Sequence, residues 1–163
     1  MPQLNSVLSQ LRCGEEVFMD GSPQSLQLAH LMTECPDLRV STSGIDLAIF
    51  LSQHTTHSTV LFGGEIDRPS RSIIPGDTLL DRRTFRIGFF GGTSYTAVSG
   101  LMEREPAIAH SKRRFVGQCE RRFALVRANQ FDRFGPYVFL PSQAIHRLIV
   151  LPVGKQIQFQ MNH

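Results

Sequence analysis

A group of small polar residues stands where an apolar run, typical of a buried strand, passes into a helical pattern. Within the stretch "FMDGSPQSLQLAHLM", residues 18–32, this group consists of Asp20, Gly21, Ser22, Gln24 and Ser25. The first amides of a helix have no partner within the helix, and the helix dipole adds positive potential there. Backbone amides, two hydroxyls and one side-chain amide could therefore hold an anion such as a phosphate. The alternative is a plain capped helix start with nothing bound, because serine is a common N-cap.

Three more groups of glycines and hydroxyls follow predicted strands further along the chain. They are Thr42-Ser43-Gly44, Gly63-Gly64 and Gly91-Gly92-Thr93-Ser94. Ligands of open parallel sheets bind at the carboxyl ends of the strands, where loops lead into helices. We expect all four groups to converge on one sheet edge, which favours a ligand site over the alternative that each glycine pair only serves a tight turn.

The elements that must position these residues alternate between strand and helix patterns. Strands are predicted at 16–20, 38–43, 58–64, 85–90, 121–129 and 145–153. Helices are predicted from Pro23 toward Glu34, at 44–53, at about 78–83 and at 106–120, and residues 65–77 are predicted to be irregular. Strands separated by helices indicate an α/β fold, a single domain with a mostly parallel sheet and helices on both faces.

The composition excludes several classes of protein. No uncharged apolar run approaches the roughly 18 residues of a membrane span. The first residues lack the basic-then-apolar order of a signal peptide, so a cytoplasmic location is expected. Three scattered cysteines and the pair His54 and His57 do not supply a ligand set for zinc, and neither a metal nor a cofactor is predicted.

The charge balance is mildly basic, with a net charge of +3. The basic residues are spread along the chain without interleaved aromatic residues. Solvated helix faces and loop ends are therefore favoured over a nucleic-acid groove for the clusters Arg82-Arg83, Lys112-Arg113-Arg114 and Arg121-Arg122.

The order of the motifs resembles the C-terminal effector-binding domain, or sensor domain, of DeoR-type transcriptional regulators. The series is D-G-S-P-Q-S, V-S-T-S, V-L-F-G-G, I-P-G-D and I-G-F-F-G-G, followed by the helix around Lys112, and it covers nearly the whole chain. The resemblance implies the fold group of ribose-5-phosphate isomerase. It also implies binding of a phosphorylated sugar or related metabolite, and assembly into a homo-oligomer.

The resemblance carries over residue by residue. It assigns ligand or phosphate binding to Asp20, Gly21, Ser22, Gln24, Ser25, Thr42, Ser43, Gly63, Gly64, Gly91, Gly92 and Lys112. Gly76 and Gly88 also match glycines of the family. The departures from its pattern are Pro23 for a hydroxyl residue, Ser43 for asparagine, Phe90 for an acid, and Ala128-Asn129-Gln130-Phe131 for Ser-Ser-Lys-Phe. We therefore expect phosphate recognition to persist and sugar discrimination to be weakened or altered.

The resemblance implies a regulator with two parts, a helix-turn-helix followed by the sensor. No such pattern precedes the first strand, so residues 1–163 are predicted to be a sensor domain alone, either a fragment or a protein without its DNA-binding part. The runner-up function is a sugar-phosphate isomerase, which needs a base near the sugar carbon, but the loop Gly88–Gly92 has no acid. A pure oligomerisation module would leave the clustered glycines and hydroxyls unexplained.

Overall fold

The computed structural model describes residues 2–76 and 83–153. Its centre is a six-stranded sheet in which every neighbouring pair is parallel. In spatial order the strands are β11 (Arg147–Leu151), β9 (Cys119–Arg127), β6 (Phe85–Gly91), β1 (Glu16–Met19), β2 (Arg39–Thr42) and β3 (Ser58–Leu61). The predicted α/β fold with a mostly parallel sheet is confirmed.

The strand order reverses between β1 and β6. From β1 the chain proceeds outward through β2 to β3 on one side, and later through β6 and β9 to β11 on the other. Val17 pairs with Val40 on one neighbour and with Ile87 on the other. The loops that leave β1 and β6 therefore diverge to opposite sides, and such a switch point is where open α/β sheets place their ligands.

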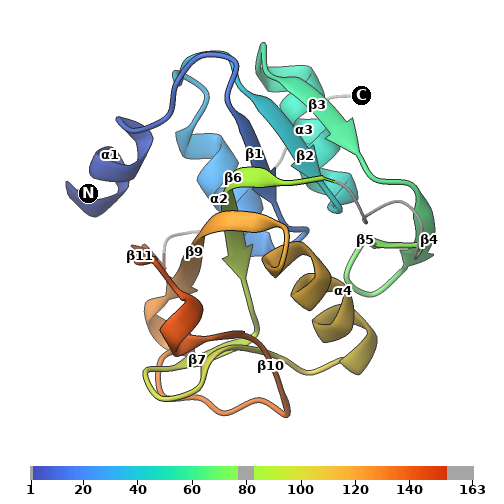
Figure 1. Ribbon diagram of the computed structural model, residues 1–163, viewed down its shortest axis with the longest axis vertical. Coiled ribbons are helices and arrows are strands. Elements are labelled where there is room, and N and C mark those ends of the chain that lie inside the picture. Colours follow the sequence, from blue (N-terminus) through green and yellow to red (C-terminus); the bar gives the residue numbers. More distant parts are fainter. Residues whose placement is uncertain (1, 77–82, 154–163) are drawn as a thin grey trace.

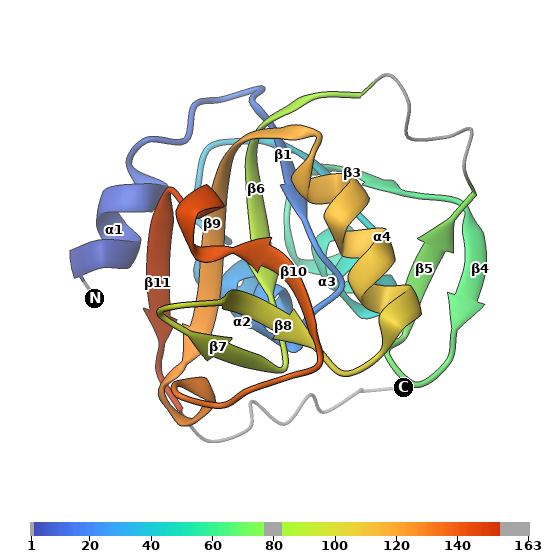
Figure 2. The same ribbon diagram turned by 60° about the horizontal axis from the view of Figure 1, so that its bottom comes forward.

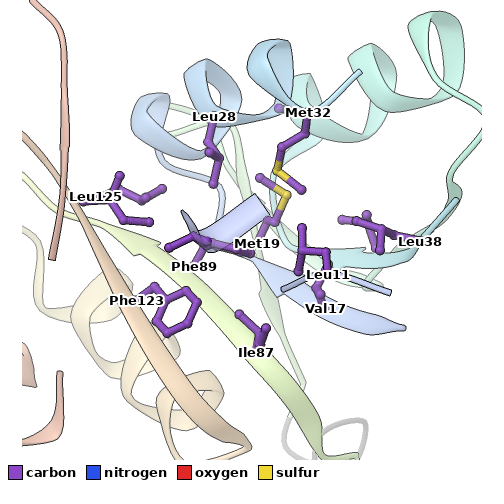
Figure 3. Packing of buried hydrophobic residues seen from close by; sticks show 14 of the residues in the cluster. Leu11, Val17, Met19, Leu28, Met32, Leu38, Ile87, Phe89, Phe123 and Leu125 are labelled. Carbon is purple, nitrogen blue, oxygen red and sulfur yellow. The ribbon is translucent and has the colours of Figure 1, made fainter. Parts of the chain in front are cut away.

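Helices cover both faces of the sheet, as predicted. The helices α1 (Pro2–Leu8), α2 (Pro23–Leu31) and α3 (Ile45–His54) lie on one face, where alternate residues of the strands, such as Val17 and Met19, enter a mainly aliphatic cluster (Figures 1 and 3). Figure 3 shows Leu28 and Met32 of the α2 segment above Met19 and Phe89 of the sheet.

The opposite face is covered by α4 (Pro106–Val116) and a small antiparallel sheet (Figure 2). This sheet has the order β10 (Tyr137–Pro141), β8 (Gly100–Glu103), β7 (Ser94–Thr96). The cluster on this face is aromatic, with Phe18 of β1 stacked on Phe115 of α4 at 4.2 Å between ring centroids. None of the described helices is long and apolar enough to cross a membrane.

Residues 65–77, predicted to be irregular, contain most of a β-hairpin. Its strands are β4 (Gly64–Asp67) and β5 (Ser72–Pro75). The hairpin docks on the loop after β2, because the Ile73 amide donates to the Ser43 carbonyl at 2.7 Å and the Ile45 amide donates to the Arg71 carbonyl at 3.0 Å. The irregular prediction was wrong because each strand has only four residues, too few to show alternation beside the prolines.

Element ends also differ from the prediction in two places. The last long helix stops at Val116, and Cys119 already begins β9, so the predicted end at Glu120 was wrong. The helix from Pro23 ends at Leu31, before Pro36 can act on it. The elements β7, β8, β10 and α1, with the short turns η1 (Ala128–Gln130) and η2 (Ser142–Ala144), were not predicted. The helix predicted at about 78–83 falls almost wholly outside the described residues.

Candidate functional site

Asp20, directly after β1, is completely buried at the start of α2. Its Oδ1 atom accepts hydrogen bonds from the Ser22 amide at 3.1 Å, the Ser22 hydroxyl at 2.5 Å and the Ser25 hydroxyl at 2.6 Å. Ser22 is the N-cap of α2, as expected, since its Oγ accepts from the Ser25 amide at 3.2 Å. In this structure the two serine hydroxyls therefore donate to a carboxylate of the chain itself.

The same carboxylate joins the two loops of the switch point. Asp20 Oδ2 accepts from the Gly91 amide at 3.0 Å, across 71 residues of sequence. It also lies 3.2 Å from Lys112 Nζ, which reaches the switch point from α4. We refer to this group as the switch-point cluster, consisting of Asp20, Ser22, Ser25, Gly91, Glu103 and Lys112.

All three N–H donors of the Lys112 ammonium group have a partner. Nζ donates to Glu103 Oε1 at 2.6 Å and to the Gly91 carbonyl at 2.7 Å, in addition to the Asp20 pair, and it lies 4.9 Å from the centroid of the Phe139 ring. Burial lowers the pKa of Lys112, but the attraction and hydrogen bonds of Asp20 and Glu103 outweigh burial, so this pKa is raised. Two carboxylates and one ammonium leave the cluster with a formal charge of −1.

Two glutamines meet at the next carbonyl. Gln24 Nε2 donates to the Gly92 carbonyl at 2.9 Å, and Gln130 Nε2 donates to the same oxygen at 2.8 Å. Gln130 Oε1 accepts from the Arg127 amide at 2.9 Å. Gln24 Oε1 is buried and has no hydrogen-bond partner among the described residues.

Glycines in the predicted site serve close packing of the chain. A Cβ atom on Gly21 would lie 2.2 Å from Ser72 Oγ and 3.0 Å from the Gly44 Cα, so the loops after β1 and β2 touch beneath the β4–β5 hairpin. A Cβ on Gly91 would lie 2.4 Å from Ser22 Oγ. Gly92 is equally confined, against the Met102 carbonyl.

The predicted residues divide into three groups. The structure brings Asp20, Ser22, Gln24, Ser25, Gly91, Gly92 and Lys112 together at the switch point. Gly21, Thr42 and Ser43 belong to the adjoining contact with the hairpin, where Thr42 Oγ1 accepts from the Gly44 amide at 3.0 Å.

Gly63 and Gly64 form the third group, and the expected convergence of all four loops does not extend to them. Both are exposed, and Gly64 lies against Ile74 and Pro75 as the first residue of β4. The loop after β3 leads into the hairpin rather than into a helix at the switch point.

Sequence reasoning missed Glu103, Gln130 and Phe139 as parts of this site. Glu103 is a buried acid that ends the apolar stretch "GLME", and an acid in such a strand is the signal that could have been used. Gln130 was treated only as a lost lysine, yet its amide holds the β6 loop. Phe139 could not be found, since nothing in its sequence surroundings points to Lys112.

Histidines and arginines outside the site have structural contacts. His57 is buried, and its Nδ1 accepts from the Leu38 amide at 3.1 Å. Among residues 2–76 and 83–153, no group of three or more His, Cys, Asp or Glu side chains could hold a metal ion. Arg113 donates to the Val138 carbonyl and Arg122 to the Ala144 carbonyl, so these basic side chains brace the chain.

Comparison with solved structures shows the fold. The chain matches eIF2B delta from Chaetomium thermophilum with a TM-score of 0.58 and 16% identity, over 90% of this chain and 53% of that one. It matches ribose 5 phosphate isomerase A from Neisseria gonorrhoeae with a TM-score of 0.52 and 4% identity, over 79% of this chain and 51% of that one. The tetrameric eIF2B-beta2-delta2 complex from C. thermophilum gives 0.58 and 13%, over 90% and 53%.

The chain thus spans about half the length of these solved structures, and the likeness extends to the fold alone. No curated protein gives a significant match. The family described as DeoR C terminal sensor domain matches residues 5–150, which include all the strands of the sheet except the last residue of β11. The chain therefore belongs to the DeoR C-terminal sensor domain family.

Proposed function

We propose that this sensor domain binds a phosphorylated sugar or a related phosphorylated metabolite at the switch point between β1 and β6. The observation that carries the proposal is a buried ammonium group, Lys112 Nζ, beside the first turn of α2 at this position of the sheet. An ammonium group and the amides of a helix start both attract a phosphate. The family and its role as a ligand sensor support the same reading.

Binding requires an exchange of partners at Lys112. Its three donors are already occupied by Asp20, Glu103 and the Gly91 carbonyl. Asp20 is held by four further donors from the α2 start and the β6 loop, whereas Glu103 reaches the cluster from β8 by a side chain that is not completely buried. We therefore propose that a phosphate replaces Glu103 on Lys112 and leaves Asp20 in place.

A thermal-shift screen of the purified chain tests the proposal. The panel contains inorganic phosphate, ribose 5-phosphate, glucose 6-phosphate, fructose 6-phosphate and their free sugars. A ligand at a hundredfold excess over its Kd stabilises the folded state by about 2.7 kcal/mol. We expect at least one sugar phosphate to raise Tm while its free sugar does not. Unchanged melting with every phosphate compound would exclude the proposed function.

The substitution Glu103→Gln tests the exchange itself. It removes a like charge beside the incoming phosphate, so affinity for the phosphate compound found in the screen should rise by about tenfold, which corresponds to about 1.4 kcal/mol. Glu105→Gln is the matched control, because Glu105 is exposed and caps α4 without a side-chain hydrogen bond. Equal changes in both variants, measured by calorimetry, would mean that Glu103 does not compete with the ligand.

One observation favours a second candidate, a sugar-phosphate isomerase. The sequence offered no acid in the β6 loop, but Glu103 supplies a carboxylate at the switch point. Aldose–ketose isomerisation transfers a proton through such a base. Incubation of each sugar phosphate in D₂O with the chain, followed by NMR, would reveal deuterium at the carbon next to the carbonyl. We expect none, because the family is that of a sensor domain.

We also propose that this domain belongs to a cytoplasmic regulator, which contacts DNA only through a helix-turn-helix outside residues 1–163. Arg113 and Arg122 support this, because their side chains donate hydrogen bonds to backbone carbonyl groups of the chain and do not form a free basic surface. Anisotropy titration should show no sequence-specific DNA binding by this chain at physiological salt. Light scattering should show a dimer or larger homo-oligomer, which is proposed from the family alone.

A further inference from the structure

Gln24 has a hydrogen-bonding capacity that the described residues do not use fully. Its side chain is buried, with 2% of its surface exposed, and lies in the first turn of the nine-residue helix α2. Nε2 is fixed on the Gly92 carbonyl at 2.9 Å. This bond also fixes the orientation of the amide, since the opposite orientation would set two oxygens against each other. Oε1 therefore lies on the side of Gly91, only 2.7 Å from where a Cβ of that residue would be.

The buried Oε1 atom lacks a partner among the described residues. Most buried polar side-chain atoms are hydrogen-bonded, and a buried acceptor left without a donor destabilises the folded state. A ligand that brings a donor to this atom recovers that loss. The phosphate group of a fully ionised phosphate ester cannot do so, because this dianion offers only acceptors.

Gln130 provides the internal comparison. Both glutamines donate through Nε2 to the same Gly92 carbonyl, but Gln130 Oε1 accepts from the Arg127 amide at 2.9 Å. Gln130 is therefore satisfied at both ends and holds the loop. Gln24 also holds the loop through its Nε2 atom. Its Oε1 atom accepts no hydrogen bond from the described residues and lies next to the loop that contributes Gly91 to the switch-point cluster.

We infer that Gln24 Oε1 accepts a hydrogen bond from a hydroxyl group of the ligand and so selects hydroxylated phosphate esters over plain ones. The inference rests on the proposed function and adds the chemical feature beside the phosphate. A site whose buried polar group stays unpaired with the wrong ligand discriminates strongly against that ligand. Selectivity for a hydroxyl close to the ester is the expected result, with no requirement on the rest of the sugar.

The test compares two kinds of phosphate ester on three proteins. Calorimetry measures the affinity of the sugar phosphates named above and of propyl phosphate, which carries no hydroxyl group. The proteins are the unaltered chain, Gln24→Met and Gln130→Met. For the unaltered chain we expect at least one sugar phosphate to bind tenfold or more tightly than propyl phosphate. Gln24→Met should remove this preference by weakening only the sugar phosphate, whereas Gln130→Met should change both affinities by the same factor.

A second measurement needs no variant and is independent of any effect on folding. In the unaltered chain, NMR follows the side-chain carbonyl carbons of both glutamines while the sugar phosphate is added. The Gln24 signal should shift as Oε1 gains a donor, and the Gln130 signal should stay. An unmoved Gln24 signal, or an equal loss of both esters in Gln24→Met, would overturn the inference while leaving phosphate binding intact. Absence of binding by every phosphate compound would instead remove the proposed function, and the inference with it.

Discussion

The two edges of the six-stranded sheet carry charged residues in opposite ways. At the carboxyl-terminal edge, Asp20, Glu103 and Lys112 are buried and contact one another. At the amino-terminal edge, a shallow depression is lined by charged groups that mostly face solvent, among them Arg12, Glu16, Arg86 and Glu120. The same residue types thus form a fixed arrangement at one edge and a solvated surface at the other.

This difference indicates which charges have a role beyond solubility. Removing a charge from water is costly, and a buried ion pair often stabilises a fold no better than apolar side chains would. An arrangement of three buried charges is therefore poorly explained by stability alone. At the amino-terminal edge, the pair Arg39–Glu16 is exposed at both side chains and carries no such cost, so nothing about it requires a function. Three predictions test the contrast, beginning with the largest expected effect.

Lys112→Met should destabilise the chain most. It leaves Asp20 and Glu103 buried without their cation, and breaking such a buried pair costs about 3–5 kcal/mol. Arg12→Met, at the other edge, is the control and should change the free energy of unfolding by less than about 0.5 kcal/mol. Urea denaturation measures both. Similar midpoints for the two variants would show that the switch-point cluster is as solvated as the amino-terminal edge.

A substitution at Gly21 should have an intermediate effect. Gly21→Ala places a Cβ 3.0 Å from the Gly44 backbone and 2.2 Å from Ser72 Oγ, and such crowding typically costs about 1–3 kcal/mol. Gly63→Ala is the matched control, because a Cβ there meets no heavy atom of the described chain within 4 Å. A loss of stability confined to Gly21→Ala would sharpen the assignment of Gly21 to packing. Equal stability of the two alanine variants would contradict it.

The smallest expected effect is the dependence of stability on pH, which has opposite directions at the two edges. The raised pKa of Lys112 contributes stability below its ordinary value of 10.5, and this is lost as the pH rises through the higher folded value. His30 lies near the end of α2, toward the amino-terminal edge. Burial first, and His54 second, lower its pKa, so its contribution is present above pH 6.5 and is lost as the pH falls below that value.

Urea denaturation from pH 5 to pH 11 measures both directions. His30→Gln should flatten the acidic side alone. Lys112→Met should remove the loss on the alkaline side. An acidic side that stays unchanged in His30→Gln would assign that dependence to another group.

Much of the fold was predictable because its signals are local. The Ser22-Pro23 pair marks the start of α2, and runs such as "VFM" and "FRIGFF" mark buried parallel strands. The β4–β5 hairpin was not predictable in the same way. Its docking depends on Arg71 adopting a positive φ of 51° beside the loop after β2, and arginine gives no local sign of that conformation.

The candidate site was predictable in its location and not in its internal contacts. The sequence pointed to Asp20, Ser22 and Ser25 at a helix start, and these residues do lie at the switch point. It could not show that the two hydroxyls donate to Asp20, because the position of that carboxylate depends on Gly91 and Lys112. In the sequence, Asp20 is 71 positions away from Gly91 and 92 positions away from Lys112. The topology of the sheet therefore sets these contacts.

The position of β1 has a consequence for the order in which the chain folds. In the six-stranded sheet, β1 joins β6 through pairs such as Val17 with Ile87, and this is the pairing that connects strands from before residue 76 with strands from after residue 83. The strands β1 to β3 have partners close along the chain and can associate early. The β1–β6 pairing must wait for closure of a 70-residue loop, and long-range parallel pairing is slow. Asp20 follows β1 and Lys112 lies after β6 in the chain, so we expect their contact to form together with this pairing.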